Sequence, residues 1–153
     1  MAENREEILD RMQTALAAIT VANSYRTTVV NVSREFKTFD EVPSAQRPWI
    51  SCFPDPTSQP PRVYEFGGSR FQLDVVIVAH LDARAQADKV SAVSNLAADI
   101  EDAMVEDNPT WGGYAVQTTC IQDAQSDEGA EDPKGTKGGS VSFTMKFRTE
   151  WYE

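Results

Sequence analysis

The chain has 153 residues, a length typical of one domain, and a formal net charge of −10 at pH 7 with a pI near 4.5. Affinity for nucleic acid comes from Lys and Arg side chains that neutralise phosphates, so this charge argues against a protein that wraps DNA. It is compatible with an acidic wall past which DNA slides without adhering. The sequence contains no run of about 18 apolar residues, which argues against a membrane-spanning helix and a membrane partner.

The first predicted element is an amphipathic helix that ends near Asn23. Asn4 stands where an N-cap residue is expected, because short polar side chains accept hydrogen bonds from the first free N–H groups of a helix. Apolar residues then recur at helical spacing, which predicts one face packed on the rest of the domain. These residues are Ile8, Leu9, Met12, Ala15, Leu16 and Ile19.

Two strands and a proline-rich arm follow. β-branched residues predict a strand over residues 27–34, with Val30 and Val32 on one face. A shorter strand over residues 49–53 is closed by a proline, which cannot donate to a strand ladder. Residues 54–62 contain four prolines and join two strands, so we expect a long loop or a hairpin arm.

The longest alternation of the first half covers residues 69–80. Phe71 begins an apolar face of every second residue, as in a half-buried strand, and glycines at 67–68 predict a turn from a short strand over 63–66. Val76 and Val78 interrupt the polar face. The strand is therefore predicted to be covered on both faces over part of its length, either within a sheet or beneath a partner subunit.

A second amphipathic helix follows and ends before residues 108–109. Its apolar stripe includes Val90, Val93, Leu96, Ala97, Ile100 and Met104. Asp99, Asp102 and Glu106 share another face of this helix, at spacings of three and four residues. This spacing predicts an acidic ridge that faces outward, and a solvated helix face is the simplest interpretation of it.

Two further strands complete the domain, over residues 115–124 and 140–151. The stretch 125–139 between them is acidic and then glycine-rich, which predicts a second loop or arm that does not pack into a core. The order of elements predicts one domain over residues 1–153 with an α+β fold. We expect a mixed, mainly antiparallel sheet covered by two α-helices, with long loops or hairpin arms.

Side chains that could carry catalysis or bind a metal are few. His80 is the only histidine, and a lone histidine at a strand end is more often structural than a general base. Without a second histidine or a Cys-x-x-Cys pair no zinc site is expected, and Cys52 and Cys120 fit buried, reduced thiols. The sequence predicts no catalytic, cofactor-binding or metal-binding residue and no enzyme activity. A carboxylate-dependent hydrolase is the enzyme alternative.

The order of the elements, together with several local phrases, resembles a known family. The phrases are those at residues 25–32, 71–78, 98–104, 111–113 and 141–152. In this layout the chain resembles the tail terminator proteins of long-tailed bacteriophages over nearly its whole length. A neck or tail-completion protein of the same virion region, or a non-viral ring-forming assembly module, would share the general layout and stays open as an alternative.

The resemblance implies a structural virion protein. Such a subunit forms a hexameric ring that caps the tail tube, terminates tail polymerisation and joins the tail to the head. The implied partners are further copies of the chain, the tail tube protein and a head–tail connector or neck protein, while DNA passes through without specific binding. The implied location is the tail or neck of the virion, after assembly in the host cytoplasm, and no cofactor is implied.

The family offers no catalytic residue to transfer to this chain, so the candidates are interfaces. Candidate partner contacts are Pro54, Pro56, Pro60, Pro61 and Arg62 in the first arm and Asp127, Glu128, Glu131, Asp132 and Lys137 in the second. In a ring, the ridge of Asp99, Asp102 and Glu106 would face either the channel or a neighbouring subunit.

Overall fold

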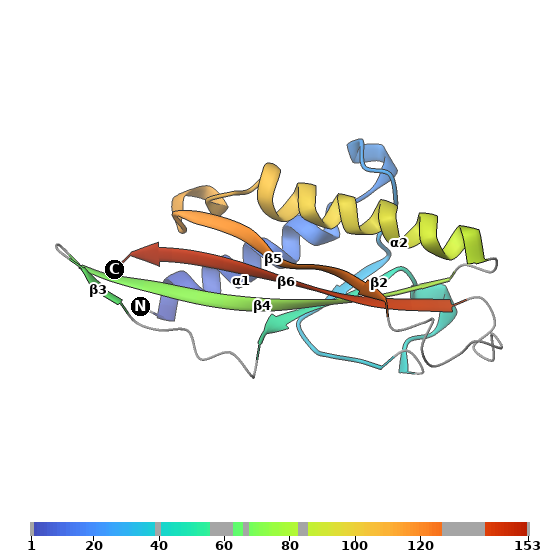
Figure 1. Cartoon of the computed structure of the whole chain (residues 1–153), viewed down its shortest axis with the longest axis horizontal. Coiled ribbons are helices and arrows are strands. Elements are labelled where there is room, and N and C mark those ends of the chain that lie inside the picture. Colours follow the sequence, from blue (N-terminus) through green and yellow to red (C-terminus); the bar gives the residue numbers. More distant parts are fainter. Residues whose placement is uncertain are drawn as a thin grey trace.

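The computed structural model describes residues 2–38, 41–55, 63–65, 68–82, 86–126 and 140–152. They form one sheet with two long helices on one of its faces (Figure 1). The helical elements are α1 (Ala2–Ala17), η1 (Val21–Asn23), η3 (Ser44–Gln46), α2 (Gln86–Glu101), the π-helical η4 (Asp102–Glu106) and η5 (Trp111–Gly113). The strands are β1 (Asn31–Ser33), β2 (Trp49–Pro54), β3 (Val63–Glu65), β4 (Gly68–Asp82), β5 (Gln117–Ser126) and β6 (Ser140–Tyr152).

The sheet is mixed but mainly antiparallel. Its strand order is β1-β2-β4-β6-β5, and β3 pairs with the first residues of β4. Strand β1 runs parallel to β2, whereas the other described pairings are antiparallel. The predicted α+β class, with a mainly antiparallel sheet covered by two helices, is therefore confirmed.

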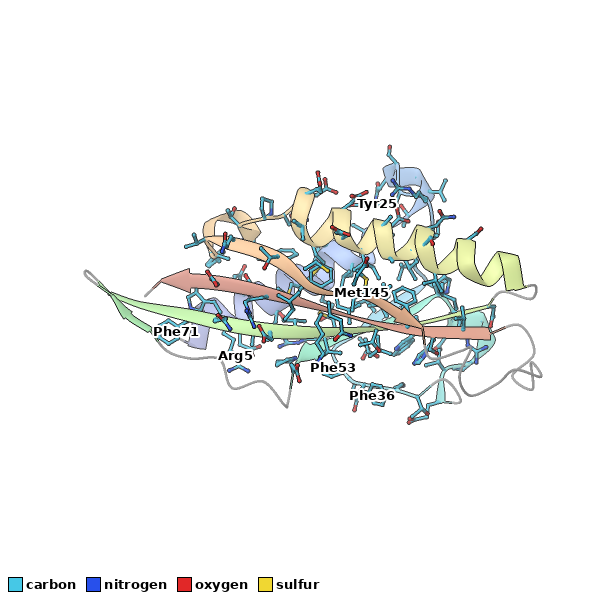
Figure 2. The ribbon with its side chains drawn as sticks, viewed as in Figure 1. Arg5, Tyr25, Phe36, Phe53, Phe71 and Met145 are labelled. Carbon is cyan, nitrogen blue, oxygen red and sulfur yellow. The ribbon has the colours of Figure 1, made fainter. Side chains whose placement is uncertain are left out.

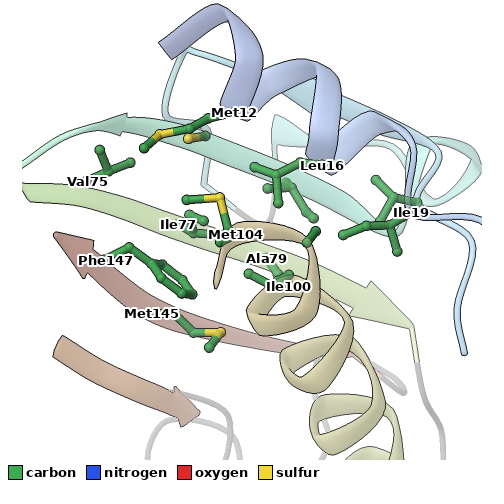
Figure 3. Packing of buried hydrophobic residues seen from close by; sticks show 14 of the residues in the cluster. Met12, Leu16, Ile19, Val75, Ile77, Ala79, Ile100, Met104, Met145 and Phe147 are labelled. Atoms are coloured by element: carbon green, nitrogen blue, oxygen red, sulfur yellow. The ribbon is translucent and has the colours of Figure 1, made fainter. Parts of the chain in front are cut away.

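Strands β4 and β6 form the centre of the sheet. They are opposed over 13 residue pairs, from Arg70 opposite Tyr152 to Asp82 opposite Ser140. Because side chains alternate between the two faces of a strand, the odd-numbered residues of both strands point toward the helices. Figure 3 shows this face packed against α1 and α2. Fully buried contributors from both layers include Met12, Leu16, Ile77, Ile100, Met104, Met145 and Phe147.

The opposite face of β4 is covered by the chain itself. Val76 and Val78 are each only 7% exposed and lie outside the main core cluster. The connection from β1 to β2 crosses this face, where Phe36 meets Phe53 edge-on with ring centroids 5.9 Å apart, on the side of the sheet away from α2 (Figure 2). The prediction of a strand covered on both faces is correct. A partner subunit is not needed to explain Val76 and Val78, because residues of the same chain cover them.

Several local predictions were wrong. Helix α1 begins at Ala2, so Asn4 lies inside its first turn and is not the N-cap, and the helix ends at Ala17, before the predicted end near Asn23. The strand expected over residues 27–34 is reduced to Asn31–Ser33. Val29 is buried and its N–H donates to the Ile19 carbonyl, whereas Val30 is 54% exposed. The strand starts late because backbone N–H groups at its predicted start bind a carboxylate of α2 instead of a neighbouring strand.

Replacing Ile77 with Ala is expected to lower the free energy of unfolding by about 2–5 kcal/mol, because the side chain is fully buried and its removal leaves a cavity. The matched control is Ile121→Ala on β5, where the side chain is 41% exposed and the expected loss is below about 0.5 kcal/mol. Urea denaturation measures both variants. Equal losses would contradict this assignment of the core.

Candidate interaction surfaces

Asp99 of α2 is buried and is not part of an exposed acidic ridge. Its carboxylate accepts hydrogen bonds from the N–H of Arg26 at 3.1 Å, from the N–H of Thr27 at 2.9 Å and from the Thr27 hydroxyl at 2.6 Å. The Arg26 guanidinium adds an ion pair at 3.0 Å. The side chain of Asp99 is 0% exposed as a result. The predicted outward ridge is therefore wrong at this residue, because the chain's own backbone covers it.

Residues 24–28, which we call the clasp, bind the outer side of α2 and η4. Besides Asp99, the clasp reaches Asp102, which is 3.2 Å from the Arg26 guanidinium, and Asp107, which accepts a 2.6 Å hydrogen bond from the Tyr25 hydroxyl. Hydrogen bonds to Asp102 and Asp99 raise the pKa of Arg26. Within the predicted ridge, Glu106 alone is exposed and Asp102 is half-buried. The acidic face left for a channel or a neighbour is therefore smaller than the sequence predicts.

A shallow groove of about 460 Å³ lies between α1 and the turn at η5. Arg11 crosses it, with Nε 3.0 Å from a Glu7 carboxylate oxygen and the guanidinium 4.9 Å from the centre of the Tyr114 ring. Gly112 adopts φ +71°, and a Cβ there would lie 2.6 Å from the Arg11 guanidinium. Both the backbone angle and the close approach therefore favour glycine at this position. The three charged side chains of the groove all have partners, since Arg11 pairs with Glu7 and Asp10 pairs with Arg34 outside the groove.

Charged pairs cross the sheet face that lies away from the helices. Arg148 binds Asp74 through two nitrogens, at 2.8 and 3.2 Å, and Lys146 lies 3.1 Å from Asp55. The hydrogen bond to Asp74 raises the pKa of Arg148. Both carboxylates are almost buried, with 7% of each side chain exposed, so the pairs balance charges that would be costly to bury alone. These contacts join β2, β4 and β6 and act as structural ties.

The predicted arms are only partly within the described residues. Pro54 is the last residue of β2, lies opposite Val75 and is half-buried, so it belongs to the sheet and does not begin an arm. Strand β3 pairs with the first residues of β4, as the predicted glycine turn requires (Figure 1). The other candidate contacts lie outside the described residues, namely Pro56, Pro60, Pro61, Arg62, Asp127, Glu128, Glu131, Asp132 and Lys137.

The candidate chemical groups that the structure describes make structural contacts. His80 is 3% exposed, with Nδ1 2.7 Å from the Ser142 hydroxyl and Nε2 donating to the Lys37 carbonyl at 2.7 Å. Burial raises the pKa of the Cys52 thiol to about 12. Across the described residues, no three His, Cys, Asp or Glu side chains gather as ligands of a metal ion would. The described helices include none long and apolar enough to cross a bilayer.

Comparison with known proteins shows a likeness to a solved structure. No protein-family model matches the sequence, and no curated protein matches it. Among solved structures, the chain is similar to a protein chain in the virion of a native gene transfer agent particle, with a TM-score of 0.57 and 18% sequence identity. The match covers 93% of this chain and 92% of that chain. The two chains therefore share a fold over nearly their whole lengths.

Replacing Asp99 with Ala is expected to destabilise the domain by about 1–3 kcal/mol, because it removes the acceptor of two backbone N–H groups and one hydroxyl. The matched control is Glu106→Ala on the same helix face, which is exposed and should change stability by less than about 0.5 kcal/mol. Hydrogen exchange at Arg26 and Thr27 should become faster in the Asp99 variant alone. Unchanged exchange at these two amides would contradict the clasp.

Burial, followed by the hydrogen bond to Asp107, raises the pKa of Tyr25 to about 12. Because the phenol of an unfolded chain ionises near about pH 10, the contribution of Tyr25 to stability is complete below that pH and is lost as the pH rises through about 12. Phenolate absorbance should show a late-titrating component that is missing from Tyr25→Phe. Asp107→Asn should move that titration to lower pH, and an unmoved curve would show that Asp107 does not act on Tyr25.

Proposed function

We propose that this chain is a structural protein of a phage-like virion and acts as a tail terminator. Six copies close into a ring on the end of the tail tube, stop its polymerisation and present a second face to the head connector. The observation that carries the proposal is the fold likeness to a virion protein across nearly the full length of both chains. The layout of the sequence elements, which resembles the tail terminator family, supports the same role.

The described surface suits an assembly role. The hydrogen bonds of His80 and the ion pair of Arg148 with Asp74 are structural contacts within the subunit. The proposed role needs no catalytic activity. In the ring, Glu106 and the exposed part of Asp102 form the acidic face of η4, directed toward the channel or a neighbouring subunit. Carboxylates in that position repel phosphates, so DNA passes without adhering. The other partners are the tail tube protein and a connector or neck protein of the virion.

Charge opposes free assembly. Six copies with a net charge of −10 each carry six times −10, or −60, before counter-ions bind. Salt screens repulsion between exposed charges over about 8 Å at physiological ionic strength, so a free ring is favoured by high salt. Contact with a tube end holds the subunits together and supplies a second route to assembly.

The expected result is a six-fold mass at high protein and salt concentration, measured by analytical ultracentrifugation, and mainly monomer at low salt. Negative-stain images should show annuli on the ends of purified tail tubes, and tubes should stop growing when the protein is added. Binding to connectors but not to tube ends would favour a neck protein. The tail terminator role would be contradicted by a protein that remains monomeric at high salt and leaves tube ends uncapped.

A further inference from the structure

We draw no further inference here: the strongest candidate, the groove of about 460 Å³ between α1 and the turn at η5, has charged side chains that are paired within the chain, and nothing in the described part of the structure shows what would occupy it.

Discussion

The structure depends on the long antiparallel pairing of β4 with β6. Its 13 opposed pairs fix which residues face the helices and which face the other side, because a shift of one residue would exchange the two sets. The helix side receives Ile77 and Met145, and the other side receives Asp74 and Arg148. A single register therefore produces both the apolar core and the buried ion pairs, and errors in it would be costly on both faces at once.

The regular alternation in β4 and β6 is the reason that the fold class could be predicted. A period of two over a dozen residues has few alternative interpretations, and helical spacing in α1 and α2 is equally specific. The same patterns could not show that Asp99 is buried. An acidic residue on the side of a helix occupies the same position in the sequence pattern whether its carboxylate binds water or backbone N–H groups. Two threonines after Arg26 are the only local sign of donors, and they resemble a strand start just as well.

The coverage of the second sheet face illustrates the same limit. Val76 and Val78 correctly indicate that something covers β4 on both sides, but the covering group depends on the path of residues 34–38 and 41–48. That path is held by contacts between residues far apart in sequence, such as His80 with the Lys37 carbonyl. A hydrophobic pattern reports burial and carries no information about the chain that supplies it. Of the candidate interface residues, those in the loops have no comparable pattern, so their assignment comes only from the family resemblance.

The clasp has a mechanical consequence. Asp99 accepts hydrogen bonds from the backbone N–H groups of Arg26 and Thr27, and the Tyr25 hydroxyl donates one to Asp107. The helix layer is therefore tied at two points to the stretch that leads into β1. Sliding of α2 along this edge of the sheet would have to break these hydrogen bonds, so the clasp opposes a relative movement of the two layers.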